Sequence, residues 1–190
     1  MGCNRIGHSA ATGHFSALYA KLAIVPLTTL VPAPKIDILL PAKERFSPSN
    51  AGAISGVVRD LVQASRAANQ YRILGTAVAN PSMPECFTGL LPRKRWFRGH
   101  NIGLAAAYLE LIETTGAPDL VEVHSRCQVA GYLATKKPAL KTCLYLHNDP
   151  RQMKAGRSVA ERRYLLQNMA GIICVSDYIR NCFLDGLDEY

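Results

Sequence analysis

Several common catalytic signatures are missing from this 190-residue sequence. It contains no G-x-S-x-G nucleophile elbow, no Walker A phosphate loop and no G-x-G-x-x-G after its first strand-like run. Their absence argues against a serine hydrolase, an NTPase and a typical dehydrogenase. No helix-turn-helix, RNP signature or metal finger is present either, so nucleic acid is not an expected partner.

Cysteine is present, but not in the patterns that bind metal ions. The six cysteines form no CxxC pair and do not cluster with histidines at metal-ligand spacing, so no metal site is predicted. Cys143 and Cys174 lie inside apolar, strand-like runs, where a thiol behaves as a small buried hydrophobe. This use of cysteine favours a reducing cytoplasm over secretion.

Acidic residues are few relative to basic ones. The chain has 14 Asp and Glu against 22 Lys and Arg, a formal net charge of +8. This balance favours anionic partners such as phosphorylated sugars, an anionic membrane surface or nucleic acid, without choosing among them. The remaining composition is ordinary for a globular protein, and the length suits one domain.

The first 34 residues differ from the rest, because they contain no acidic residue and no strand-loop-helix order. We therefore expect residues 1–34 to be an N-terminal extension, either a disordered tail or the result of a start placed too far upstream. Residues 22–34 are uncharged, but 13 residues with three prolines are too few and too broken to span a bilayer. A poor signal peptide is the alternative.

From Lys35 onward, short apolar strands alternate with helices, which predicts an α/β fold with a doubly wound, mainly parallel, Rossmann-like sheet over residues 35–190. Strands joined by helical crossovers pair in parallel, so the loops after them share one edge of the sheet, where a ligand should bind. Residues 79–99 are expected to be loop with at most short strand pieces. The expected strands are 36–40, 71–78, 119–124, 141–147 and 171–175, and the expected helices are 54–62, 102–112, 129–134, 158–169 and 177–184.

The order of these pieces resembles the N-terminal domain of family 4 glycosyltransferases, which have the two-domain GT-B fold. The resemblance covers residues 36–187. It is carried by the small-residue loop Asn50-Ala-Gly52 before a helix, by Pro118-Asp-Leu-Val-Glu-Val-His124, by Leu144-Tyr-Leu-His-Asn-Asp149, and by the run from Glu161 through Ile172-Ile-Cys-Val-Ser176 to Arg180. The family commonly has a glycine pair in the first loop, whereas here only Gly52 is present.

This resemblance implies an enzyme that transfers a sugar from a nucleotide-sugar to an acceptor, with retention and without a required metal. The nucleotide-sugar is then a co-substrate, and no cofactor is expected. Many members build lipopolysaccharide, capsule or other cell-envelope glycans at the inner face of the membrane, and their N-terminal half mainly binds the acceptor. The donor-binding domain, with its pair of glutamates, would follow Tyr190, so these 190 residues are not expected to catalyse transfer alone.

Histidines end two neighbouring strands and are the first candidates for site residues. His147 is the candidate catalytic residue, because its imidazole can orient a sugar hydroxyl by hydrogen bonding beside Asn148 and Asp149. His124 occupies the equivalent position on the preceding strand and is a candidate for substrate binding. Alternatively, either histidine only ties down a loop.

Two further loops carry candidates for substrate binding. Asn50, Ala51 and Gly52 precede a helix, where backbone amides can bind a phosphate or a sugar oxygen, although a plain turn has the same sequence. Ser176 follows the last strand and is either a ligand-binding residue or an N-cap.

One basic and aromatic segment suggests a contact with anionic lipid headgroups or with an anionic acceptor. It comprises Arg93, Lys94, Arg95, Trp96 and Arg98, and a solvated loop is the alternative. We therefore expect a cytoplasmic protein that is peripheral at the inner membrane face if this segment binds lipid. The alternative to an enzyme half is a free-standing Rossmann-like module that binds a glycan or a partner subunit.

Overall fold

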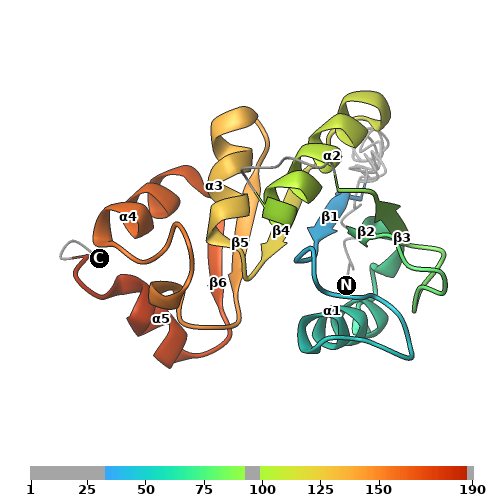
Figure 1. Cartoon of the computed structure of the whole chain (residues 1–190), viewed down its shortest axis with the longest axis horizontal. Helices are drawn as coiled ribbons and strands as arrows, with labels where there is room; N and C mark the ends of the chain where they lie inside the picture. Colours follow the sequence, from blue (N-terminus) through green and yellow to red (C-terminus); the bar gives the residue numbers. More distant parts are fainter. Residues whose placement is uncertain (1–32, 93–98, 188–190) are drawn as a thin grey trace, which may run out of the picture. The chain divides into compact units, whose positions relative to one another are not determined.

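Six parallel strands form one sheet in the order β3-β2-β1-β4-β5-β6 (Figure 1). The computed structural model describes residues 33–92 and 99–187, so the expected extension before residue 33 and the basic segment 93–98 lie outside the described residues. This strand order is that of the doubly wound Rossmann fold, with its switch point between β1 and β4. The predicted fold class is therefore confirmed. The strands are β1 (Ile36–Leu39), β2 (Tyr71–Thr76), β3 (Phe87–Leu90), β4 (Leu120–His124), β5 (Thr142–Leu146) and β6 (Gly171–Cys174).

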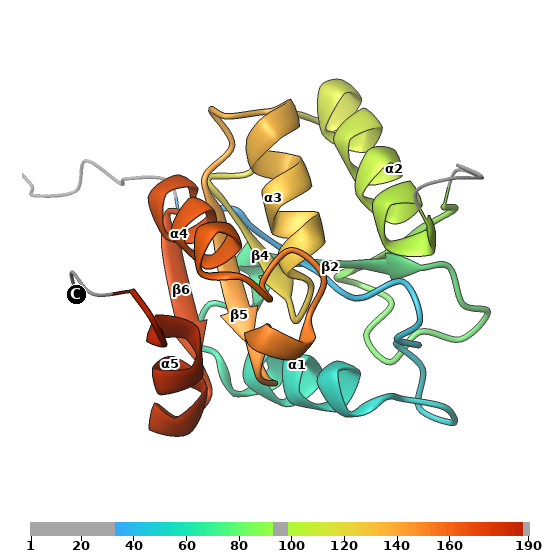
Figure 2. The same cartoon turned by 60° about the vertical axis from the view of Figure 1, so that its left-hand side comes forward.

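The helices lie on both faces of this sheet. Figure 2 shows α1 on the opposite side from α2, α3 and α4. Right-handed crossovers require this arrangement, because the chain moves from β1 toward β3 in one direction and from β3 toward β6 in the other. The helices are α1 (Ala53–Ala64), α2 (Gly99–Thr115), α3 (Cys127–Lys136), α4 (Val159–Asn168) and α5 (Asp177–Leu184), with short 3-10 turns η1 (Ala68–Gln70) and η2 (Pro150–Gln152).

Each face has its own hydrophobic core. The larger core lies under α2, α3 and α4 and includes Leu39, Val123 and Leu144 from the strands. The smaller core lies under α1 and includes Ile38 and Ile73. Since alternate strand residues point to opposite faces, the apolar runs of β1 and β2 supply both cores, whereas β4 contributes Val121 and Val123 to the larger core only.

Beyond the smaller core, the α1 side of the sheet carries polar and aromatic side chains. The registers pair Ile38 with Glu122 and His124 with Tyr145, so these residues share the face that α1 covers over β1 and β2. Farther along the same face, Ile173 is 40% exposed. Polar residues on an interior strand of this kind are a deviation from the apolar pattern, and they lead directly to the candidate site.

Strand β3 lies within the stretch that was expected to be mostly loop. Its four residues, Phe87–Leu90, pair with β2 at the edge of the sheet. A four-residue strand that includes Gly89 and follows Pro84 has too little alternation to be distinguished from a loop by sequence. Its pairing with β2 depends on the tertiary structure.

Candidate functional site

The ends of β4 and β5 bring His124 and His147 into direct contact. Nδ1 of His124 lies 3.0 Å from Nε2 of His147, a hydrogen-bonding distance. The two rings also stack with that of Tyr145, with centroid separations of 4.8 Å from Tyr145 to each histidine and 5.1 Å between the histidines. The sequence predicted two separate histidines at one sheet edge, and the structure joins them into one hydrogen-bonded pair.

The environments of these two histidines differ. His124 is only 1% exposed, whereas His147 is half-buried. Burial, and in second place the charge on His124 when that ring is protonated, lowers the pKa of His147 to about 4. At neutral pH His147 is therefore an uncharged imidazole, which can accept a hydrogen bond at one ring nitrogen and donate one at the other.

The turn after β4 positions this pair. Ser125 has a positive φ of 49°, in the left-handed region that a non-glycine residue rarely adopts. Its backbone N–H donates to the carbonyl of Tyr145 at 2.8 Å, and its Oγ accepts from the backbone N–H of His147 at 3.3 Å. These two contacts hold the end of β4 against the end of β5, so the strained turn fixes the position of the His147 backbone.

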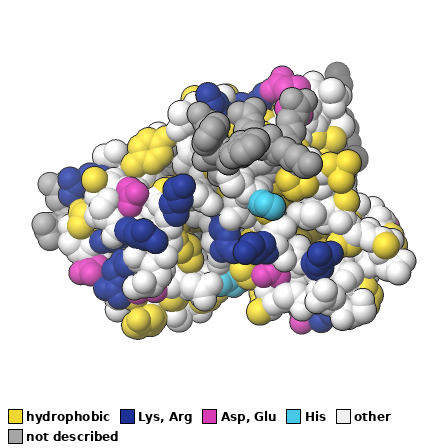
Figure 3. Space-filling model, in the orientation of Figure 1, with side chains coloured by type: hydrophobic (Ala, Val, Ile, Leu, Met, Phe, Trp, Pro, Cys, Tyr) yellow, Lys and Arg dark blue, Asp and Glu magenta, His cyan; other side chains and the backbone are white. Residues whose placement is uncertain are grey.

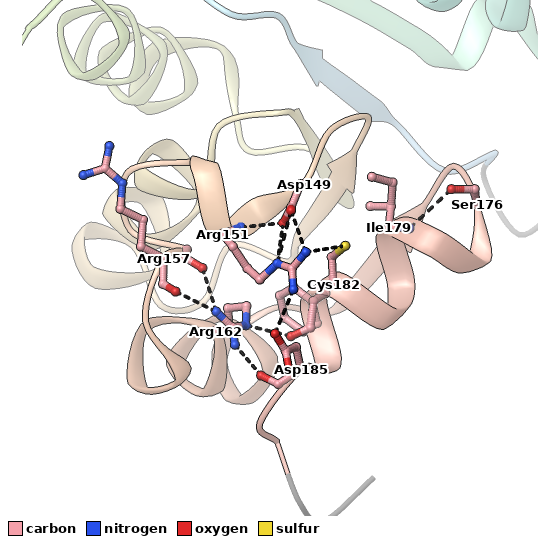
Figure 4. A network of polar contacts seen from close by, with 10 residues as sticks. Asp149, Arg151, Arg157, Arg162, Ser176, Ile179, Cys182 and Asp185 are labelled. Atoms are coloured by element: carbon pink, nitrogen blue, oxygen red, sulfur yellow. Dashed lines mark hydrogen bonds and ion pairs between the residues drawn. The ribbon is translucent and has the colours of Figure 1, made fainter.

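The next two candidates, Asn148 and Asp149, have different roles in the structure. Asn148 is exposed beside the pair. The carboxylate of Asp149 accepts from the backbone N–H of Arg151 at 2.9 Å and from its Nη2 at 2.8 Å, and so it caps η2 (Figure 4). Hydrogen bonding to Arg151 is also the main cause that lowers the pKa of Asp149. Asp149 therefore shapes the loop around His147, with its main acceptor sites already in use.

The loop before α1 places Asn50 and Ala51 at the surface and makes Gly52 the N-cap of the helix. The chain's own Glu44 occupies the helix N-terminus. Its Oε2 accepts from the backbone N–H of Ser55 at 3.3 Å and from the Ser55 hydroxyl at 3.2 Å. A Cβ at Gly52 would collide with this carboxylate. The position at which the sequence predicted a ligand phosphate or sugar oxygen thus holds the Glu44 carboxylate.

Because Glu44 caps α1, Glu44→Ala is expected to lower the free energy of unfolding by about 1 kcal/mol. Glu44→Gln keeps an acceptor oxygen and should lose less. Urea denaturation followed by circular dichroism measures both, with Glu85→Ala, an exposed carboxylate in the β2–β3 loop, as the matched control. Equal stability of Glu44→Ala and Glu85→Ala would show that the cap contributes nothing.

Ser176 lies at the end of β6 as the N-cap of α5. Its Oγ accepts from the backbone N–H of Ile179 at 3.3 Å (Figure 4). Of the two interpretations from sequence, the structure supplies a capping contact for this hydroxyl. Ser176 is not among the residues that contact the histidine pair.

Basic side chains surround the carboxyl edge of the sheet. Figure 3 shows dark blue Lys and Arg side chains spread over much of one face, and Figure 4 shows the Arg157 side chain extending away from the polar network. The loops that follow β1, β4 and β5 carry several cations. Apart from Arg151, none of these cations forms an ion pair within residues 33–92 and 99–187. These unpaired cations are Lys43, Arg45, Arg126, Lys154 and Arg157. They make this edge suited to an anionic molecule.

Sequence reasoning missed two residues of the site, Glu122 and Tyr145. Oε2 of Glu122 lies 3.5 Å from Nε2 of His124, and Tyr145 stacks on both histidines. A signal was present, since each residue precedes a histidine by two positions and therefore shares its strand face. The missing information was which face of β4 and β5 is polar, because that depends on where α1 packs.

Within the described part of the chain, no group of three potential metal-ligating side chains is close enough to hold an ion. None of the described helices is long and apolar enough to cross a membrane. The described cysteines, Cys86, Cys127, Cys143, Cys174 and Cys182, are all free thiols. Burial raises the pKa of Cys143 to about 11, which fits the small buried hydrophobe expected from the sequence.

Comparison with known proteins adds little to this geometry. No protein-family model matches the chain, and no curated protein matches it. A solved structure of the RcsB response regulator of Salmonella typhimurium matches with 12% identity and a TM-score of 0.37, over 80% of this chain and 55% of that one. This chain therefore spans less than two thirds of that protein's length. A similarity at this level carries no argument about function.

Proposed function

We propose that this chain is the acceptor-side domain of a glycosyltransferase, in which His147 orients a sugar hydroxyl. The observation that carries the proposal is the unpaired ring nitrogen of His147, Nδ1. Nε2 is engaged with His124, whereas Nδ1 has no hydrogen-bond partner within the described residues and is not buried. A neutral imidazole with one free nitrogen, at the carboxyl edge of a Rossmann-like sheet, is suited to bind a hydroxyl.

The surrounding loops support an acceptor with negative charge. Arg126 and Lys154 line a cavity of about 230 Å³ beside the switch point, together with Asn101 and Ser125. Asn101 also accepts from the backbone N–H of Ala42 at 2.9 Å, which ties the start of α2 to the loop after β1. Cations at a polar cavity favour a phosphorylated or acidic saccharide over a neutral one.

Transfer itself needs groups that this domain does not supply. In the proposal, the nucleotide-sugar binds to a second domain, and its leaving diphosphate is stabilised there. His147 acts on the acceptor alone, by holding the hydroxyl so that an oxygen lone pair faces the sugar to be transferred. Envelope glycans or glycolipids are the acceptors implied by the family resemblance, and lipid contact through residues 93–98 belongs to the same proposal.

Sugar binding tests the role of His147. The chain with ¹⁵N-labelled histidine is titrated with a panel of hexoses, heptoses and their phosphates, and the ring resonances are followed by NMR. At least one sugar should shift the His147 signals, and His147→Ala should weaken that binding by tenfold or more, about 1.4 kcal/mol. His100→Ala, which removes an exposed histidine from α2, is the matched control and should bind like the wild type.

Two outcomes would argue against this function. If no sugar changes any histidine signal, the proposed function loses its basis. Equal losses in His147→Ala and His100→Ala would exclude a specific role for His147.

The mass and activity of the endogenous protein, captured with an antibody to residues 100–180, distinguish an enzyme from a binding module. A mass about twice that of this chain, with transfer from labelled nucleotide-sugars, supports the enzyme. A mass of 190 residues with sugar binding but no transfer supports the module.

A further inference from the structure

His124 lines a cavity beneath α1, and one of its ring nitrogens is buried. Nε2 of His124 has no hydrogen-bond partner in the described part of the protein, although the residue is 1% exposed. The cavity has a volume of about 200 Å³, and Leu61 and Val62 of α1 form its apolar wall. Buried polar atoms are rarely left unsatisfied, so this nitrogen requires an explanation.

The carboxylate of Glu122 is the charged group nearest to that nitrogen. Its Oε2 lies 3.5 Å from Nε2 of His124, and its side chain is 17% exposed. The other titratable groups that line the cavity are the phenols of Tyr71 and Tyr145, and no Lys or Arg lines it. A negative charge at this distance favours a proton on Nε2 over a lone pair there.

When the His124 ring is neutral, a proton on its Nε2 determines the state of both rings. A neutral imidazole carries one N–H, so Nδ1 of His124 must then be a lone pair. Two lone pairs cannot face each other at 3.0 Å, and therefore Nε2 of His147 must donate to Nδ1 of His124. The proton of His147 is then at Nε2, and its Nδ1 is an acceptor.

We propose that Glu122 is a positioning residue that, through His124, holds Nδ1 of His147 as a hydrogen-bond acceptor. With the opposite tautomers, Nδ1 of His147 would be a donor and would occupy the lone pair that a sugar oxygen needs for bond formation. The assignment of a sugar hydroxyl to this nitrogen rests on the proposed function, but the tautomer does not.

Long-range ¹H–¹⁵N NMR of the full chain reports which ring nitrogen carries the proton, and it needs no sugar. The signals are assigned with His124→Gln and His147→Gln. In the wild type at neutral pH, Nδ1 of His147 should be unprotonated. In Glu122→Leu, Nε2 of His124 would lose the negative charge beside it, so the proton should move to Nδ1 of His124 and the tautomer ratio of His147 should reverse by about tenfold or more.

Controls separate this effect from a general disturbance. Glu122→Asp keeps the charge and should keep the wild-type tautomers, and Glu85→Leu removes a carboxylate elsewhere and should also leave them unchanged. A protonated Nδ1 on His147 in the wild type would overturn the proposal. So would wild-type tautomers in Glu122→Leu, provided that its amide spectrum shows a folded chain. If Glu122→Leu fails to fold, the tautomers of the wild type and of Glu122→Asp still test the proposal. Expected tautomers without sugar binding would contradict the proposed function and leave this inference standing.

Discussion

Arg162→Ala is expected to lower the free energy of unfolding by about 3–5 kcal/mol, because it removes a buried cation that satisfies backbone carbonyls. Arg162 is 2% exposed. Its Nε donates to the carbonyl of Phe183 at 2.8 Å, and its Nη1 donates to the carbonyls of Arg157 at 2.8 Å and Gly156 at 3.2 Å. Nη2 donates to the carbonyl of Asp185 (Figure 4).

These acceptors lie at the ends of two different elements. Phe183 and Asp185 provide carbonyls at the C-terminus of α5, which carries partial negative charge, whereas Gly156 and Arg157 lie in the loop between η2 and α4. No carboxylate binds this guanidinium within the described residues, so the carbonyls alone compensate its charge. Truncation would leave the carbonyls of Gly156 and Phe183 buried without this donor, and it would remove the side-chain link between α5 and the loop.

Arg163→Ala is the control for this prediction, because Arg163 is the next residue of α4 and is exposed. It should change stability by less than about 0.5 kcal/mol. Urea denaturation monitored by circular dichroism compares the two variants with the wild type. A loss below about 1 kcal/mol in Arg162→Ala would mean that water replaces the guanidinium at these carbonyls.

Arg72→Ala should have a comparable effect, a loss of about 3–5 kcal/mol, at the amino-terminal edge of the sheet. Its Nε and Nη2 donate to the two carboxylate oxygens of Asp37 at 2.8 and 2.6 Å. Asp37 lies in β1 and is 2% exposed. Without Arg72, this buried carboxylate would retain the hydroxyl of Tyr108, at 3.0 Å, as its side-chain donor.

A surface pair of the same composition provides the control. Arg59 and Asp60 form an ion pair at 2.8 Å on α1, and both side chains are well exposed. Arg59→Ala should cost less than about 1 kcal/mol, because solvent screens this pair. The double variant of Asp37→Leu with Arg72→Met removes both charges, and it should recover part of the loss seen in Arg72→Ala. A double variant that is less stable than Arg72→Ala would argue that packing, and not the buried charge, causes the loss.

Much of the fold follows from local patterns that the sequence displays openly. Apolar runs such as residues 36–40 and 171–175 are strands because no helical face fits them, and they match β1 and β6 closely. The capping box of Ser158 and Glu161 starts α4 as expected, with the Ser158 Oγ accepting from the Glu161 backbone N–H at 3.2 Å. Both signals depend on neighbours in sequence, so they survive without knowledge of the tertiary structure.

The candidate site was only partly predictable, because only some of its features follow from local or topological rules. His124 and His147 could be placed at one edge, because parallel strands end together. Their 3.0 Å contact, by contrast, depends on the register of β4 against β5 and on the left-handed turn at Ser125. At Gly52 the sequence predicted that a ligand would bind the amides of the helix N-terminus. No local rule shows that Glu44 folds back over these amides, because that contact depends on the tertiary structure.

The amino-acid sequence by itself determined the order of the helices and of every strand except β3, the parallel pairing and the edge at which polar residues gather, because periodicity, caps and right-handed crossovers are local or topological rules. Only the tertiary structure decided that Glu122, His124, Tyr145 and His147 form one cluster and that Arg162 joins α4 to α5. Those contacts join residues from different strands, helices and loops, and their distances depend on how the sheet packs against its helices.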